Sequence, residues 1–233
     1  MEQPVGELVS TKRAQLPTGV DLCGRYTGLR RLDPSHAPSL YKHLGGEDNF
    51  WRWTYMMTSG FPTAESCAQS IAAWSAQQDP FFYAVYSGPL SDPASEPVGM
   101  MSLMAAVPDH RRVEIGSVIL GGALVKSRQA TEAFYLFLRH AVEDMGCQRV
   151  EWKANRLNAP SLAAASRLGF TFEGIFRKHM IVKGRRRDTA WFSITDDEWP
   201  AIEAGFEAWL DEGNFDENGK QKKTLQQCRE ANA

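Results

Sequence analysis

The sequence has no long apolar segment and no marked excess of charge of either sign. No run of about 18 apolar residues occurs along the chain, so no membrane-spanning helix is expected. The N-terminal residues carry no apolar core of the kind found in secretion signals. The formal net charge is -2, which argues against bulk electrostatic attraction to nucleic acid or to an anionic membrane. We therefore expect a cytoplasmic protein with neither a membrane nor a nucleic acid as its partner.

Cysteine is scarce, and the cysteines present do not have the spacing of a metal site. Cys23, Cys67, Cys147 and Cys228 form no CxxC or comparable motif. We expect no bound metal, and we expect reduced thiols because no secretion signal points to an oxidising compartment. Cys147 falls between an expected helix and an expected strand, so we interpret it as a core residue.

The composition is that of a soluble globular protein, with 43% hydrophobic and 23% charged residues. A chain of 233 residues is long enough for one large core and short for two domains of ordinary size. We expect an N-terminal arm over residues 1–22, a single domain over 23–211, and a polar C-terminal tail over 212–233. No internal repeat or linker divides the chain.

The hydrophobic pattern predicts strands and helices in a mixed order. Strands are expected at 25–31, 81–86, 98–106, 113–120, 149–155, 172–183 and 187–195. Helices are expected at 34–44, 63–78, 130–146, 158–169 and from Thr195 to about 210. The three successive strands between 81 and 120 predict an antiparallel meander. The strand, helix and strand between 113 and 155 predict a parallel pair with a right-handed crossover, and hence an α/β (α+β) fold with a mixed sheet.

Two helix N-termini are expected at the same edge of this sheet, where ligands of such sheets bind. The first follows a basic turn that contains Lys126 and Arg128. Free backbone N–H groups and the helix dipole favour an anion there, although a solvated basic turn is the plainer interpretation. The second helix begins at Asn158, with Ser161 at its third position, which is also ordinary helix-start chemistry.

Several segments of the chain, taken in order, resemble one enzyme family. They are Glu114-Ile115-Gly116, Ala130-Thr131-Glu132-Ala133, Arg149-Val150-Glu151, Asn158-Ala159-Pro160-Ser161, and Arg167-Leu168-Gly169-Phe170 followed by Glu173-Gly174. Over roughly residues 25–200 the chain resembles the GCN5-related N-acetyltransferase (GNAT) superfamily, in its RimJ/RimL-like branch. The resemblance implies a central twisted mixed sheet, mostly antiparallel and flanked by helices. It also implies that the sheet splays open after the 113–120 strand to admit acetyl-CoA.

The resemblance further implies which residues hold the cofactor. The pyrophosphate would take backbone N–H groups from Lys126, Ser127, Arg128, Gln129, Ala130 and Thr131. The pantetheine would pair with the backbone of Val118, Ile119 and Leu120, Asn158 would contact the cofactor, and Ser161 would lie near the sulfur. Val125 and Arg128 depart from the pattern, since the family's phosphate loop has Gln or Arg at the first place and Gly at the second.

Acetyl transfer to an amine needs a base, an oxyanion donor and a partner for the departing thiolate. We expect a backbone N–H near Val118 or Ile119 as the oxyanion donor. Ser161 is the candidate for the thiolate, and its alternative is an ordinary helix residue. Glu114 is the candidate base, directly or through water, and its alternative is a solvated strand carboxylate.

Met180 occupies the place where ribosomal-protein-modifying relatives keep a glutamate base. His179 and His110 are weaker candidates for the base, and His179 needs a β-bulge to reach the face on which Met180 lies. We interpret Glu132 and Glu173 as structural residues.

Aromatic and methionine residues cluster between residues 49 and 60, where they form either core or the wall of an acceptor pocket. The residues assigned to the acceptor are Trp51, Trp53, Tyr55, Met56, His179 and Met180. The basic run Arg185 to Arg187 lies at an expected hairpin tip. It is either solvated or recognises an acidic substrate or a phosphate.

We expect an acetyl-CoA-dependent N-acetyltransferase that releases coenzyme A. Its acceptor would be the primary amine of a small metabolite or toxin, or the N-terminal amine of a peptide or protein, attacking directly in a ternary complex. The protein would be a monomer or a homodimer. Two alternatives are a non-catalytic acyl-CoA-binding or sensing protein of the same fold, and an interaction protein whose aromatic segment binds a partner.

Overall fold

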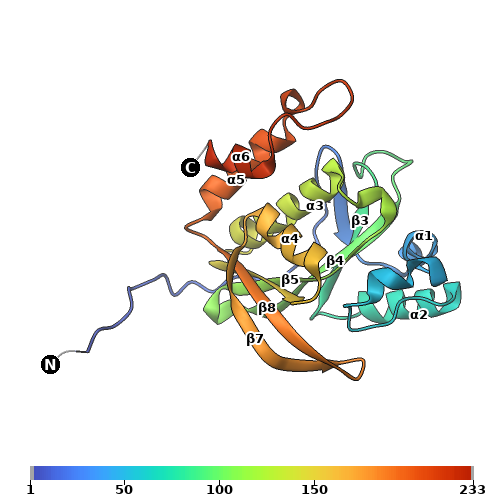
Figure 1. The fold of residues 1–233 in the computed structure, drawn as a ribbon, viewed down its shortest axis with the longest axis horizontal. Coiled ribbons are helices and arrows are strands. Elements are labelled where there is room, and N and C mark those ends of the chain that lie inside the picture. The colour runs from blue at the N-terminus through green and yellow to red at the C-terminus, as the bar shows by residue number, and fades with distance from the viewer. Residues whose placement is uncertain (1–2, 232–233) are drawn as a thin grey trace.

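The computed structural model describes residues 3–231, and these residues surround one twisted sheet (Figure 1). Within them the strand order is β1-β2-β3-β4-β5-β6-β8-β7. The strands are β1 (Leu22–Cys23), β2 (Gly28–Arg31), β3 (Phe81–Tyr86), β4 (Pro97–Val107), β5 (Arg112–Leu120), β6 (Arg149–Asn155), β7 (Thr171–Val182) and β8 (Arg185–Thr195). Neighbouring strands are antiparallel except β5 and β6, which are parallel. The expected mixed, mostly antiparallel sheet is confirmed.

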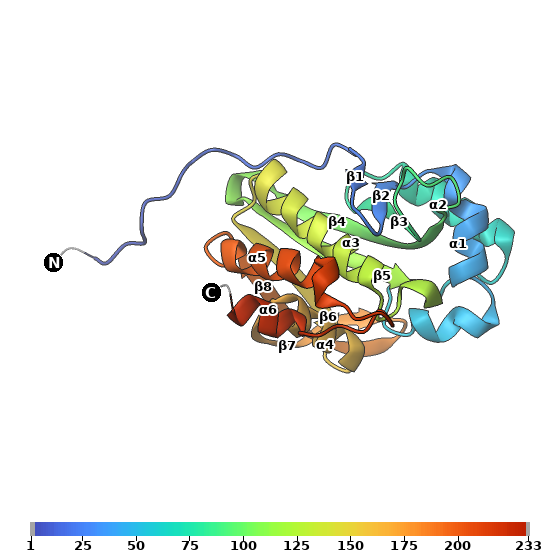
Figure 2. The ribbon, with the colours of Figure 1, turned by 90° about the horizontal axis from the view of Figure 1, so that it is seen from above.

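Helices cover both faces of the sheet (Figures 1 and 2). They are α1 (Ala37–Leu44), α2 (Ala64–Ser75), α3 (Arg128–Arg139), α4 (Ala159–Leu168), α5 (Trp199–Leu210) and α6 (Leu225–Glu230). One core joins α3, α4, α5 and α6 to the sheet, and a second core joins α1 and α2 to its other face. Alternate residues of β3 serve the two cores, as the strand period of two requires. No helix in residues 3–231 is long and apolar enough to cross a membrane.

Helix α3 is the crossover between the two parallel strands, and it begins two residues before the expected position. The Ser127 hydroxyl accepts a hydrogen bond from Ala130 N at 3.0 Å, and this cap sets the first helical residue at Arg128. The expected helix over 130–146 continues beyond α3 as a π-helical turn, His140–Asp144. Gly146, with φ of 74°, then ends it in a conformation that suits glycine.

Strands β5 and β6 pair for three residues and then part. Arg112–Glu114 lies in register with Arg149–Glu151, after which β5 continues to Leu120 and β6 to Asn155 without pairing with each other. A bulge in β5 follows the parting, because Ser117 and Val118 together stand opposite a single residue of β4 and Ser117 has a φ of 51°. The expected splay of the sheet is therefore present.

The C-terminal part differs from the expectation at the start of the last long helix. The last long helix does not begin at Thr195, because the Glu198 carboxylate accepts hydrogen bonds from Thr195 N and Oγ1 and holds a turn there. Helix α5 then begins at Trp199. The expected polar tail contains α6, which packs against α5 and buries Leu225 and Cys228.

The N-terminal arm has neither helix nor strand from residue 3 to residue 21, and its first part extends away from the body (Figure 2). Two backbone hydrogen bonds attach its second part. Ala14 N donates to Pro108 O at 3.1 Å, and Gln15 N donates to Met145 O at 2.7 Å. Residues 1 and 2, which we expect to belong to the arm, lie outside the described residues.

Candidate active site

A cavity of about 550 Å³ opens where β5 and β6 part. Its walls come from the segment after Trp53, from α2, from strands β3 to β6, from the start of α4, and from the β7–β8 hairpin. Most of the lining is apolar, whereas the charged residues in it are Glu114, Lys153 and Arg187. Such a cavity, largely apolar with a few polar groups, is typical of a small-molecule site.

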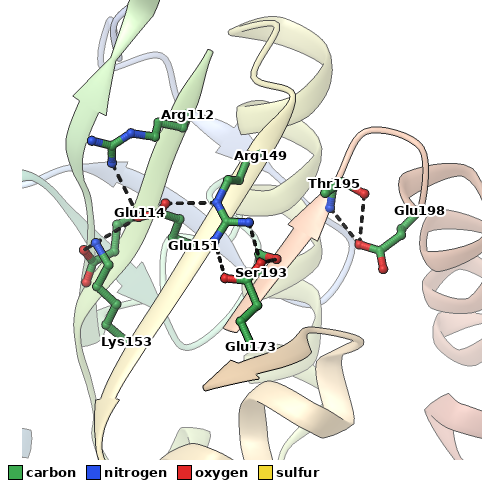
Figure 3. A network of polar contacts seen from close by, with 9 residues as sticks. All are labelled: Arg112, Glu114, Arg149, Glu151, Lys153, Glu173, Ser193, Thr195 and Glu198. Carbon is green, nitrogen blue, oxygen red and sulfur yellow. Dashed lines mark hydrogen bonds and ion pairs between the residues drawn. The ribbon is translucent and has the colours of Figure 1, made fainter. Parts of the chain in front are cut away.

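Glu114 is the buried acid of this cavity (Figure 3). Its side chain is 11% exposed, and its Oε2 accepts a hydrogen bond from Lys153 Nζ at 2.8 Å. Burial raises the pKa of Glu114, although the hydrogen bond and the charge of Lys153 act to lower it. The solvated strand carboxylate considered as the alternative is therefore wrong for Glu114. A carboxylate of raised pKa is a stronger base than an exposed one.

Lys153 connects Glu114 to a second carboxylate (Figure 3). Its Nζ lies 2.8 Å from Glu151 Oε2 and 4.1 Å from the centroid of the Trp191 ring. Burial acts to raise the pKa of Glu151, but hydrogen bonds from Lys153 and Arg149 lower it by more. Lys153 is therefore held between two anions, and sequence reasoning missed it. The alternation of β6 places Lys153 on the same face as Glu151, which was the available signal.

The network continues to the outer strands (Figure 3). Arg149 Nη1 donates to Glu173 Oε1 at 2.7 Å, and Ser193 Oγ donates to the same oxygen at 2.8 Å. Glu173 is thus structural, as expected. Glu132 is structural as well, since its carboxylate accepts the backbone N–H groups of three successive residues, 25 to 27.

Ser161 and Asn158 line the same cavity from the start of α4. Asn158 is the N-cap, and its Oδ1 accepts from Ser161 N at 3.3 Å. The Ser161 hydroxyl accepts from Trp152 Nε1 at 3.0 Å. Among the described residues neither the Ser161 O–H nor the Asn158 side-chain N–H₂ has an acceptor, so both donors are available to a ligand.

The turn before α3 retains part of the expected phosphate cradle. Within residues 3–231, the N–H groups of Arg128 and Gln129 have no acceptor, whereas Ser127 already caps Ala130. Lys126 has a φ of 58° and an exposed side chain. The Arg128 guanidinium is engaged elsewhere, because it stacks 3.5 Å from the centroid of the Phe215 ring. Two helix N–H groups and Lys126 are thus what this turn offers to a phosphate.

The cofactor and acceptor residues expected from the sequence divide between cavity and surroundings. The cavity is lined by Val118, Asn158, Ser161, Trp53, Tyr55, Met56, His179 and Met180, but not by Ile119, Leu120 or residues 126–131. Trp51 lies outside this lining, since the residue is 65% exposed and its ring centroid lies 4.4 Å from the Arg52 guanidinium, so its assignment to the acceptor stays a prediction. Trp53 serves both as core and as wall, since it is buried and its Nε1 donates to Leu44 O.

His179 and Met180 both reach the cavity because β7 is bulged between Phe176 and Met180. Lys178 lies in the bulge with a φ of 53°. His179 Nδ1 lies 3.0 Å from the Thr189 hydroxyl. From the sequence, His179 needed a β-bulge to reach the face on which Met180 lies, and β7 contains that bulge.

Cys147 is buried in the core, as expected. Burial raises the pKa of its thiol to about 11, so it is a poor nucleophile. No group of three or more potential metal ligands occurs in residues 3–231.

The site thus combines a mixed sheet that parts between two parallel strands with a buried carboxylate and a helix N-terminus at the opening. The family model described as the acetyltransferase (GNAT) domain matches residues 27–171. The chain therefore belongs to the GNAT acetyltransferase family.

Solved structures agree with this assignment. The chain is 38% identical to a GCN5-related N-acetyltransferase from Brucella melitensis, with a TM-score of 0.89 over 94% of this chain and 98% of that one. It is 32% identical to a probable GNAT-family acetyltransferase from Chromobacterium violaceum, with a TM-score of 0.76 over 86% of this chain and 98% of that one. No match was found among curated proteins.

A more distant structure shares the fold. It is the Salmonella typhimurium acetyl transferase described as modifying the N-terminal serine of a protein of the 50S ribosomal subunit. It is 19% identical, with a TM-score of 0.62 over 74% of this chain and 96% of that one. At this identity the likeness shows the fold.

Proposed function

We propose that this protein is an acetyl-CoA-dependent N-acetyltransferase that acts on a primary amine by direct attack in a ternary complex. One observation carries the proposal. The cavity at the parting of β5 and β6 brings the buried carboxylate of Glu114 and the free donors of Asn158 and Ser161 into one lining. Acetyl-CoA supplies the activated acetyl group, and coenzyme A is the product.

Glu114 acts as the general base, directly or through one water. An attacking amine must lose a proton, and a carboxylate whose pKa burial has raised accepts that proton more readily than a solvated one. Lys153 keeps Glu114 in place by its 2.8 Å hydrogen bond. Glu114 on β5 thus takes the role of the glutamate that ribosomal-protein-modifying relatives carry at the position of Met180.

Ser161 hydrogen-bonds the departing thiolate. Its oxygen already accepts from Trp152 Nε1, so its proton points away from that bond and is available to the sulfur. A backbone N–H at the β5 bulge, from Val118 or Ile119, stabilises the charge that develops on the carbonyl oxygen. No side chain is then required for the oxyanion.

The residues at the edge of the sheet fit the rest of the cofactor. The two free N–H groups at the start of α3 and the Lys126 ammonium would hold the pyrophosphate. The backbone of β5 from Val118 to Leu120 would hold the pantetheine, because its edge toward β6 is no longer paired. The Asn158 amide N–H₂ would donate to the same arm.

The acceptor is an amine with an apolar portion, since Trp53, Met56 and Tyr55 form part of the wall. We assign the protein to the RimJ/RimL-like branch on the residues quoted above. Residues 23–211 would form its single acetyltransferase domain, with the arm and the tail as additions. We propose a cytoplasmic monomer or homodimer that binds no nucleic acid.

A non-catalytic acyl-CoA sensor is the second candidate. Two observations favour it, namely Met180 in place of the relatives' glutamate and a phosphate turn in which Ser127, not a ligand, takes the Ala130 N–H. Such a protein would bind acetyl-CoA and acetylate nothing.

Two measurements test these proposals. Thermal unfolding with and without acetyl-CoA reports binding, and stabilisation is expected at micromolar concentrations. Thiol release with a panel of primary amines then reports catalysis, with a no-amine control because Cys23 is exposed and reacts with thiol reagents. Stabilisation without thiol release would favour the sensor. No stabilisation far above micromolar acetyl-CoA would exclude both.

A further inference from the structure

Arg187 is a partly buried cation that faces the cavity without a carboxylate partner. It lies on β8, and its guanidinium makes one hydrogen bond, from Nε to Thr189 Oγ1 at 3.1 Å. In the part of the chain that the structure describes, it forms no ion pair, although it feels the charge of Glu114. The Nη1 and Nη2 groups are thus free to donate.

The other cations around the cavity are already neutralised. Lys153 lies 2.8 Å from both Glu114 and Glu151, and Arg149 pairs with Glu151 and Glu173. Arg112 lies 3.5 Å from Glu151. These three cations share three carboxylates, so Arg187 adds one positive charge that, among residues 3–231, has no carboxylate of its own within ion-pair distance.

An uncompensated charge in such a place is costly. Burial lowers the pKa of Arg187, which shows that its surroundings disfavour the cation. The charge of Glu114 acts to raise this pKa, but Glu114 lies outside ion-pair distance of Arg187 and is already bonded to Lys153, while Met100, Met104 and Trp191 add only apolar wall. A planar guanidinium with free N–H groups matches a carboxylate in a two-point arrangement, and burial strengthens that contact.

Arg187 lies on the wall of the cavity that the β7–β8 hairpin forms, together with the expected acceptor residues His179 and Met180. The β7–β8 hairpin is tied to the aromatic segment there, since Lys183 Nζ donates to Trp53 O at 2.7 Å. Arg187 is in register with Met180, which lines the same cavity. The phosphate turn before α3, by contrast, lies outside the cavity lining.

We propose that Arg187 binds a carboxylate of the acceptor, so that the acceptor is an amino acid or a close analogue. Its amine would face Glu114, its carboxylate Arg187, and its apolar side chain the wall of Trp53, Met56 and Met104. This inference rests on the proposed acetyltransferase activity and names its substrate class. It favours a free amino acid over the N-terminal residue of a protein as the acceptor, because a peptide bond replaces the carboxylate in that residue.

The test compares phenylalanine, leucine and methionine, each beside its amide and its decarboxylated amine. The kcat/KM of each compound is measured by thiol release for the native protein and for Arg187→Gln, and the ratio of the two cancels the intrinsic reactivity of the amine. We expect Arg187→Gln to lower kcat/KM about 10²-fold for the amino acids, mainly through KM, as for removal of one partner of a buried charge pair. The decarboxylated amines should change less than about threefold.

Two further variants keep the result interpretable. Arg185→Gln removes an exposed arginine from the same strand and should leave every ratio near one. Arg187→Lys retains the charge without the planar fork, and should recover part of the activity on amino acids. Unfolding midpoints of all variants show whether they fold.

Two outcomes would overturn the inference. One is an equal loss for acids and decarboxylated amines in Arg187→Gln. The other is a native protein that acetylates other amines but none of the three amino acids. Failure of the acetyltransferase proposal itself is distinguishable, since then acetyl-CoA gives no stabilisation and no amine gives thiol release.

Discussion

Lys153 Nζ lies 2.8 Å from Glu114 Oε2, across the opening at which β6 leaves β5 (Figure 3). The two residues are 39 positions apart in the sequence and become neighbours because the parallel strands are in register at Glu114 and Glu151. The pair holds a buried carboxylate in the cavity and moderates the rise in its pKa.

Replacing Glu114 by glutamine tests the assignment of the base. Glu114→Gln should lower kcat by about 10²- to 10³-fold, since it removes a positioned proton acceptor and retains the shape of the side chain. The affinity for acetyl-CoA, measured by calorimetry, should change little. A variant that keeps native kcat would remove Glu114 from the mechanism.

The pH profile should move when Lys153 is replaced. In the native protein the activity should fall as the pH drops through the raised pKa of Glu114, because the protonated acid is no base. Lys153→Met removes the hydrogen bond and charge that lower this pKa, so the acid limb of kcat/KM should move to higher pH.

The same variant should lose about 3 kcal/mol of unfolding free energy, because Glu114 and Glu151 lose a buried partner. Lys42→Met serves as the control, since Lys42 makes an exposed ion pair with Glu96. An unshifted acid limb in Lys153→Met would contradict the role given to the pair.

Ser161→Ala should slow turnover about tenfold, because it removes a hydrogen bond to the departing thiolate. The affinity for acetyl-CoA should stay within about threefold, since Asn158 and the β5 backbone are unchanged. Ser166→Ala, on an exposed position of the same helix, is the matched control. Unchanged turnover in Ser161→Ala would exclude its assigned role.

Asn158 combines a structural and a binding function that two substitutions separate. Asn158→Ala loses the N-cap and should cost about 1 kcal/mol of stability together with acetyl-CoA affinity. Asn158→Asp keeps the capping oxygen but loses the amide N–H₂, so its stability should stay near native while acetyl-CoA binds more weakly. Equal affinity in Asn158→Asp and the native protein would show that the amide does not contact the cofactor.

The acidic cluster on α5 should make stability depend on pH. Burial, together with a hydrogen bond and the negative charge of Glu143 and the charge of Glu207, raises the pKa of Glu203 to about 7. Because the folded pKa exceeds the unfolded value, Glu203 contributes to the stability of the folded state in full below the unfolded pKa of about 4.5. This contribution is lost as the pH rises through 7.

At pH 8, Glu203→Gln should therefore be more stable than the native protein by about 1 kcal/mol of unfolding free energy, after allowance for solvent screening. It should also unfold at a higher temperature. The difference should vanish well below pH 4.5, where Glu203 is protonated in both states. Glu217→Gln, at an exposed position, should show no such pattern. Thermal unfolding at several pH values makes the comparison.

The sequence by itself determined the strands from β3 to β8, the helices from α1 to α5 and their order, but not β1 or α6. Periodicity placed the strands and helices, and the N-cap at Asn158 was correct because capping depends on residues three apart in the chain. The parallel pairing of β5 and β6 and the structural use of Glu132 and Glu173 also followed from the local pattern and the resemblance.

The tertiary structure decided what faces the cavity. Lys153 and Arg187 line the cavity because β6 parts from β5 and the β7–β8 hairpin supplies another wall, and His179 and Met180 both reach it because β7 is bulged before them. The alternation of β6 put Lys153 on the face of Glu151, but the parting of the strands and the bulge of β7 depend on contacts between strands, which no local pattern in the sequence indicates. The charge balance that leaves Arg187 without an ion pair among residues 3–231 likewise depends on distances between distant strands, so it emerges when the sheet is assembled.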